Sequence, residues 1–156
     1  MGMRPSSVCL YKNPGQFRVL TKASNHRPPY TARVQTDGSF GMRYEPISRT
    51  AVILTDSSGI RHSLCKTYFD HRNSTESEWC SVLDGFNYCL KKDEGAVELE
   101  NDNLGVMMSL IQRNPPRHGY LADYYAMIRR QLTHLEYVGV RWIPRQLNKA
   151  DGLFRL

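Results

Sequence analysis

The spacing of apolar residues is the feature that most constrains this chain, because its period changes partway along the sequence. Up to residue 69, apolar and β-branched stretches are separated by turns, as in an antiparallel meander of three strands. From residue 74 onwards, apolar residues recur at intervals of three and four, which predicts amphipathic helices with two further strands between them. We therefore expect a mixed α/β fold, in which helices pack on a mixed sheet. The expected strands are 33–40, 50–55, 60–69, 96–100 and 136–143.

The expected helices begin and end at specific signals. The first opens at 74–76, where Thr75 is the expected N-cap and Glu78 completes a capping box. The second covers 104–111 and stops before a Pro-Pro pair, because proline cannot continue a helix. The remaining expected elements are a helix over 120–135, one or two helical turns within 150–156, and a short strand at 16–20.

Length and charge restrict the classes of protein to which the chain can belong. Its 156 residues suit one domain, and no apolar run approaches the ~18 residues that a membrane helix requires. The net charge is +6, and residues 1–32 hold five basic side chains and no acid. We interpret 1–32 as a basic arm or small appendage and 33–156 as the folded domain. Such an arm fits a polyanionic partner such as nucleic acid, or it is only a solubilising tail.

The cysteines give little support to a zinc site. The sequence contains no Cys-x-x-Cys pair. Cys65, Cys80 and Cys89 lie in apolar stretches, where we expect them to be small buried side chains. Reduced thiols are typical of a cytoplasmic, intracellular protein.

Four acidic residues lie at the ends of expected elements, where a mixed sheet can bring them together. They are Asp37 at the end of the first strand, Glu78 in the first turn of a helix, Asp102 directly after the fourth strand, and Asp151 at the start of the last helical turns. Clustered carboxylates repel one another unless cations lie between them. Oxygen ligands without Cys or His select hard ions such as Mg²⁺ or Mn²⁺. Two such ions form the usual clamp for in-line phosphodiester hydrolysis.

Each acid taken singly also has a structural interpretation. Asp37 fits a turn, Glu78 fits a capping box, and both Asp102 and Asp151 fit helix N-caps. The interpretation as a metal site therefore depends on all four acids occurring in this order on these elements.

The short sequence motifs around the four acids resemble those of a known family. They are Thr36-Asp37-Gly38-Ser39-Phe40 leaving the first strand, Glu76–Phe86 in the first helix, Glu100-Asn101-Asp102-Asn103-Leu104 at the fourth strand, and Ile143–Asn148 followed by Ala150–Leu153. Together they resemble the type 1 ribonuclease H family and its retroelement relatives over residues 33–156. The family's pattern for this helix matches Glu78, rather than Glu76, to the position of the metal ligand.

The resemblance implies a ribonuclease H-like fold with a five-stranded sheet, three antiparallel strands plus two parallel, flanked by helices. It implies an endonuclease that hydrolyses the RNA strand of an RNA–DNA hybrid with two Mg²⁺ ions, for which Mn²⁺ could substitute. The implied ligands and catalytic residues are Asp37, Glu78, Asp102 and Asp151. We expect a monomer with a nucleic-acid partner and no membrane partner.

A hybrid substrate needs amide, hydroxyl and cationic donors near the metal ions. The candidates lie beside the four acids. The alternative interpretation is that they are ordinary solvated loop residues. They are Gly38, Ser39, Arg72, Asn73, Ser74, Thr75, Arg145 and Asn148.

The sequence departs from the family pattern near its end. The loop 144–149 holds no histidine, which many members use in product release, so the resemblance implies slower turnover. The interval from Asn148 to Ala150 is one residue shorter than is common. Two alternatives therefore stay open: a DNA nuclease or resolvase on the same fold, and a catalytically degenerate domain that binds nucleic acid without cutting it. The complete set of four acids favours an active ribonuclease H.

Overall fold

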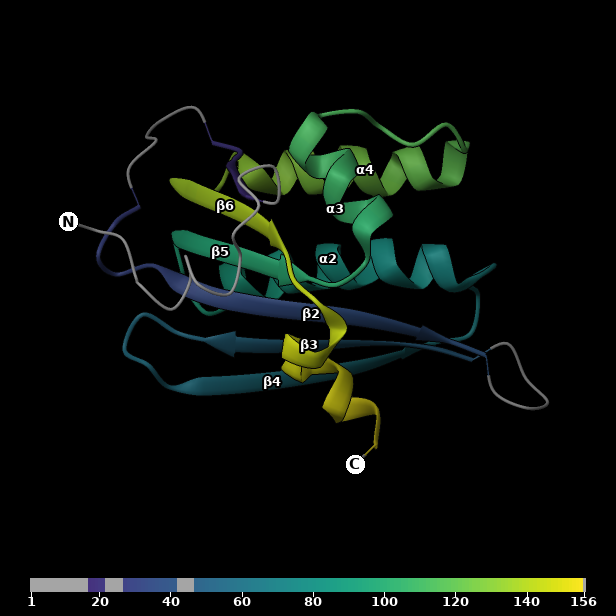
Figure 1. Cartoon of the computed structure of the whole chain (residues 1–156), viewed down its shortest axis with the longest axis horizontal. Coiled ribbons are helices and arrows are strands. Elements are labelled where there is room, and N and C mark those ends of the chain that lie inside the picture. Colours follow the sequence, from purple (N-terminus) through teal and green to yellow (C-terminus); the bar gives the residue numbers. More distant parts are fainter. Residues whose placement is uncertain (1–16, 22–26, 42–46, 156) are drawn as a thin grey trace.

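The computed structural model describes residues 17–21, 27–41 and 47–155, and its centre is a six-stranded sheet (Figure 1). The strands lie in the order β1-β6-β5-β2-β3-β4. Antiparallel pairing joins β2 to β3 and β3 to β4, and parallel pairing joins β2 to β5 and β5 to β6. This confirms the predicted meander and mixed sheet. The strands are β1 (Phe17–Val19), β2 (Ala32–Phe40), β3 (Ser48–Thr55), β4 (Arg61–Tyr68), β5 (Ala96–Asn101) and β6 (Tyr137–Trp142).

The sheet has one strand more than the five that the family resemblance implies. The additional strand, β1, pairs antiparallel with β6, where Phe17 lies opposite Arg141. Just beyond it, Leu20 is buried in the core and its N–H donates to Val138 O at 2.7 Å. The short strand expected at 16–20 therefore forms, and it belongs to the sheet. Residues 1–16 and 22–26 lie outside the described residues, so the role of the basic arm stays a prediction.

Three α-helices cover one face of the sheet, and short 3₁₀ helices cross the other (Figure 1). The α-helices are α2 (Ser74–Lys91), α3 (Leu104–Gln112) and α4 (Gly119–Leu132). Helix α4 ends three residues before the predicted boundary. The 3₁₀ helices are η2 (Arg145–Leu147) and η3 (Lys149–Arg155), and η3 packs Ala150 against Ala51 and Ile53 of β3. No helix in the described part of the chain has the length and apolar character needed to cross a bilayer.

Alternation along the strands divides the apolar core from the face crossed by η3. Val34 and Val52 point to the α-helices and are completely buried. Gln35 and Ile53, each one position further along its strand, point to the opposite face, and so does Cys65 of β4, which lies opposite Ala51. The expectation of a buried Cys65 is wrong, because β4 lies at the edge of the sheet beyond η3 and that face of it is exposed. Cys80 and Cys89 are buried, as predicted.

The N-cap of α2 is Asn73, not Thr75 as the sequence analysis expects. Asn73 has extended backbone angles, and its side-chain oxygen accepts the N–H of Glu76 at 2.9 Å. The Glu76 carboxylate in turn accepts the N–H of Arg72 at 2.8 Å. The capping contacts thus come from Asn73 and Glu76, which leaves the Glu78 side chain available to the site below.

Candidate functional site

Three of the four predicted acids converge at one end of the sheet. Asp37 comes from β2, Asp102 follows β5, and Glu78 projects from the first turns of α2. One carboxylate oxygen of each lies within 4.8 Å of the others. The register explains the meeting of the two aspartates: Gln35 lies opposite Glu100 in the parallel pair, and each aspartate follows two residues later.

Gly38 brings Glu78 to Asp37. Its N–H donates to Asp37 Oδ1 at 3.0 Å and to Glu78 Oε1 at 2.9 Å. A Cβ atom at this position would lie 2.5 Å from the backbone carbonyl of Ser77, so only glycine lets α2 approach β2 this closely. The structure therefore gives Gly38 a positioning role for the acids, in addition to the RNA contact that the sequence analysis expects of it.

Asp102 is held through its backbone and its neighbours. The indole N–H of Trp142, at the end of β6, donates to Asp102 O at 2.9 Å. Asn103 caps α3 through its side-chain oxygen, which accepts the N–H of Val106 at 3.0 Å. The Asn103 side chain also lies beside Glu78 and lowers the pKa of that carboxyl, against the larger effect of burial. The backbone of Asp102 is thereby fixed by β6, which supplies no carboxylate, and the start of α3 lies beside Glu78.

Burial and mutual repulsion make these carboxyls hard to ionise. Burial, followed by the charges of Glu78, Asp102 and Asp151, raises the pKa of Asp37 to about 9. Burial and then the charge of Asp102 raise the pKa of Glu78 to about 7. The pKa of Asp102 is raised as well, chiefly by burial. A group of oxygens this close, with this much unrelieved repulsion, fits a divalent cation, which binds oxygen ligands at ~2.0–2.6 Å.

Asp151 lies beside the three acids but has its own counter-charges. It lines the same pocket of about 440 Å³, together with Ser39 and Phe154. Arg155 Nη2 lies 2.7 Å from its Oδ2, and Arg145 Nη2 lies 3.6 Å from its Oδ1. Both guanidinium groups are largely exposed, so they can exchange the carboxylate for another anion at low cost.

The predicted substrate contacts divide into two groups. Gly38, Ser39 and Arg145 line the acidic pocket. The four predicted contacts at 72–75 do not line it: Arg72 stacks over the Tyr120 ring at 4.2 Å, Asn73 caps α2, and Ser74 and Thr75 are exposed in the first turn of α2. Thr75 instead borders a separate depression of about 550 Å³ with Trp79 and Asn103.

Asn148 is used inside the fold. It is 4% exposed, its side-chain N–H donates to Thr36 O at 2.9 Å, and its oxygen accepts the N–H of Ala150 at 3.1 Å. Its side chain also lies beside Asp102 and lowers the pKa of that carboxyl, against the larger effect of burial. Asn148 therefore ties η3 to β2 and places Asp151 near the other acids, even with the shortened interval.

Arg155 is a pocket residue that the sequence analysis missed. It lies four residues after Asp151, the spacing at which side chains meet on a helix, and this spacing is the signal that could have found it. Phe154 lines the pocket beside it, and no pattern in the sequence distinguishes this phenylalanine from a core residue.

The strand order and the acidic pocket together define the ribonuclease H fold, and solved structures agree. The ribonuclease H1 of the halophilic archaeon Halobacterium salinarum superposes with a TM-score of 0.71 at 17% identity, over 79% of this chain and 93% of that one. The N-terminal ribonuclease H domain of a Mycobacterium tuberculosis protein, solved as a fusion with maltose-binding protein, superposes with a TM-score of 0.69 at 16% identity. The match covers 79% of this chain and 89% of that one. LC11 ribonuclease H1, solved with an RNA/DNA hybrid, superposes with a TM-score of 0.66 at 17% identity, over 78% of this chain and 92% of that one.

The model of the reverse transcriptase-like family matches residues 35–151, so the chain belongs to this family. The match contains all four acids and both 3₁₀ helices up to Asp151. A comparison with proteins of curated function finds no match.

Proposed function

We propose that this chain is an endonuclease that hydrolyses the RNA strand of RNA–DNA hybrids, with two Mg²⁺ ions held by Asp37, Glu78, Asp102 and Asp151. The observation that carries the proposal is the convergence of three carboxylate oxygens within 4.8 Å in a pocket that Asp151 also lines. Mn²⁺, which accepts the same oxygen ligands, could substitute. Membership of the reverse transcriptase-like family supports this assignment, as does the hybrid-bound structure of one neighbour.

The chain's own residues set up the reaction in two ways, beside the chemistry that the metal ions supply. Gly38 holds Glu78 toward Asp37, and Trp142 holds the backbone of Asp102, so the ligand oxygens need little reorganisation. Bound divalent cations supply water activation and charge neutralisation for phosphodiester hydrolysis. Arg145 and Arg155, at the wall of the pocket, are placed to bind the non-reacting oxygens of a phosphate.

The test is cleavage of a hybrid labelled on one strand or the other, in Mg²⁺ and in Mn²⁺. We expect the wild type to cut the RNA strand and Asp102→Asn to lose this activity. Asp123→Asn, which removes an exposed carboxylate from α4, is the matched control and should cut normally. Intact hybrid with the wild type in both metals would contradict the proposal. Duplex DNA, duplex RNA and a four-way junction in the same panel separate ribonuclease H from a DNA nuclease or resolvase.

Metal binding provides a second readout that does not depend on the substrate. We expect calorimetry to detect Mn²⁺ binding to the wild type and a clear loss of affinity in Asp102→Asn, with the control unchanged. A wild type that binds neither Mg²⁺ nor Mn²⁺ would instead favour a domain that binds nucleic acid without cutting it.

A further inference from the structure

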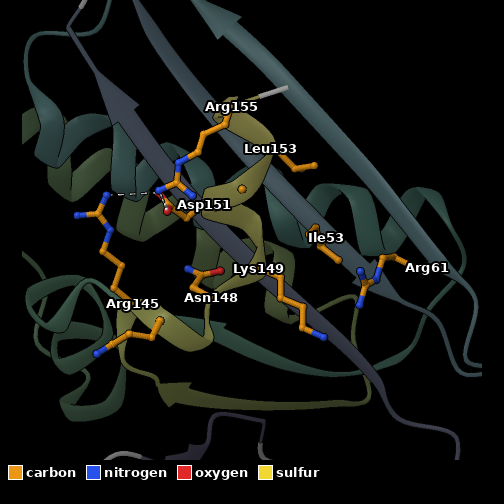
Figure 2. Close-up of a pocket in the computed structure, with 10 residues that line it drawn as sticks. Ile53, Arg61, Arg145, Asn148, Lys149, Asp151, Leu153 and Arg155 are labelled. Atoms are coloured by element: carbon orange, nitrogen blue, oxygen red, sulfur yellow. Dashed lines mark hydrogen bonds and ion pairs between the residues drawn. The ribbon is translucent and has the colours of Figure 1, made fainter.

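A depression of about 800 Å³ lies on the face of the sheet opposite the α-helices (Figure 2), and it shares lining residues with the acidic pocket. Ile53 of β3 lines it, and its sides come from β4, η2 and η3. Helix η3 covers this face only over β2 and β3, so the residues of β4 that share the face, including Ser63 and Cys65, remain exposed. The fold thus leaves an open hollow between the C-terminal segment and the edge of the sheet.

The hollow is strongly basic. Four of its described lining residues are cations and one, Asp151, is an acid. The cations are Arg61, Arg145, Lys149 and Arg155. An adjoining recess adds Arg33, which lies in the same row as Arg61, with Thr55 of β3 between them.

Two of these cations have no counter-charge in the described structure. Arg145 and Arg155 pair with Asp151, whereas no ion pair or side-chain hydrogen bond holds Arg61 or Lys149 in the described part of the chain. Figure 2 shows both side chains directed into the same space, Arg61 from β4 and Lys149 from η3. Like charges that converge in this way repel each other, and an anion between them would relieve the repulsion.

The hollow is also continuous with the acidic pocket, because Arg145, Asp151 and Arg155 line both. We propose that it binds the phosphate backbone of a single-stranded extension of the nucleic acid that occupies the acidic pocket. This identity of the ligand rests on the proposed function. A volume of about 800 Å³ is on the scale of small-ligand pockets and accommodates a few nucleotides rather than a duplex.

The chemistry of the hollow predicts binding without sequence preference. Guanidinium and ammonium groups contact phosphates, which carry no base identity. No aromatic side chain lines the hollow among the described residues, so it provides no platform for stacking bases. Ile53 and Leu153 offer only apolar contact.

The test compares the double variant Arg61→Glu/Lys149→Glu with the wild type and with Lys91→Glu/Lys92→Glu. The control makes the same change in net charge at the exposed C-terminal end of α2. Anisotropy of a labelled single-stranded oligonucleotide of ~10 nucleotides, in EDTA, reports binding in the absence of cleavage. Cleavage is then measured on hybrids with and without a single-stranded extension at either end of the RNA.

We expect the double variant to bind the oligonucleotide about tenfold more weakly at ~0.1 M salt, with a salt slope lower by ~1.4 for two lost phosphate contacts. We expect it to cut extended hybrids more slowly than the wild type and blunt hybrids at the wild-type rate, and the control to match the wild type throughout. Wild-type binding by the double variant, an equal loss in the control, or an equal loss on blunt hybrids would each overturn the proposal.

The readouts separate this proposal from the proposed function. If no hybrid is cut by any form of the protein, the proposed function fails while the anisotropy still reports on the hollow. If the glutamate variant does not fold, as judged by its melting curve, Arg61→Gln/Lys149→Gln removes the same two contacts without placing new acids beside Asp151, and the same comparisons apply.

Discussion

The substitution Gly38→Ala tests whether the approach of α2 to β2 sets the geometry of the acids. The added Cβ would lie 2.5 Å from the carbonyl carbon and oxygen of Ser77 and 2.7 Å from the Glu78 nitrogen. Ordinary contact begins at 3.4 Å, so the start of α2 must retreat by about 0.9 Å. These neighbours are backbone atoms of a helix, which cannot rotate away as a side chain can.

The retreat carries Glu78 away from Asp37 and lengthens its hydrogen bond to Gly38. Misplacement of a catalytic group by ~1 Å costs on the order of 100-fold in rate, and overpacking costs ~1–3 kcal/mol of stability. We therefore expect hybrid cleavage to fall about 100-fold, together with weaker Mn²⁺ binding by calorimetry. Wild-type cleavage by a folded Gly38→Ala protein would refute the reasoning.

Gly85→Ala is the matched control for this prediction. Gly85 also lies in α2 against β2, but the Cβ added there would meet a methyl group of Thr36 at 2.5 Å rather than backbone. We expect a loss of stability by urea denaturation that is no larger than that of Gly38→Ala, because a side-chain methyl group can move where backbone cannot, with cleavage per folded molecule reduced far less. Equal losses of activity in the two variants would show that packing in general, rather than the position of Glu78, controls the rate.

Three further predictions concern stability. The pKa values of Asp37 and Glu78 are raised in the folded state, so the folded protein binds more protons than the unfolded chain between about pH 4 and pH 9. The stability of the protein in EDTA should therefore fall as the pH rises from about 5.5 to about 8.5. Mg²⁺ should reverse this loss. Denaturant titrations at the two pH values check this, and a stability that rises with pH would contradict it. Asn73→Ala removes the N-cap of α2 and should cost ~1 kcal/mol, measured by urea denaturation, so an unchanged midpoint would argue against the cap. Tyr68→Phe removes a hydroxyl that donates to buried Asp84 at 2.7 Å and should cost ~1–2 kcal/mol while hybrid cleavage stays at the wild-type rate.

The convergence of Asp37 and Asp102 could be predicted from the sequence for a simple physical reason. Asp37 lies in β2 and Asp102 directly follows β5, and each comes two residues after the last pair of the parallel ladder, Gln35 with Glu100, so both reach the same edge of the sheet. The same reasoning extends to Glu78, because the frame of the helix places it in the first turns, next to that edge. Local patterns therefore sufficed wherever the position of a residue follows from its place at the end of an element.

Local patterns failed where a choice depends on tertiary contacts. Thr75 and Asn73 are both acceptable N-caps, and the side-chain N–H that Asn73 donates to the Tyr120 hydroxyl at 2.8 Å, from α4, is absent from any local pattern. In the sequence, Asn148 resembles a loop residue that could donate to the substrate, but its side-chain N–H donates to Thr36 O of β2. The exposure of Cys65 depends on where η3 stops covering the sheet, which no property of β4 reveals.

The short strand β1 has a consequence for how this domain can be isolated. The family match begins at residue 35, inside β2, and a chain trimmed to start at Ala32 would keep the whole of β2 and all four acids. It would lose β1 and Leu20, leaving the backbone N–H and C=O groups along the outer edge of β6 without partners. Open strand edges of apolar sequence pair with other molecules. The trimmed domain is therefore expected to aggregate, so the smallest well-behaved unit starts no later than residue 17.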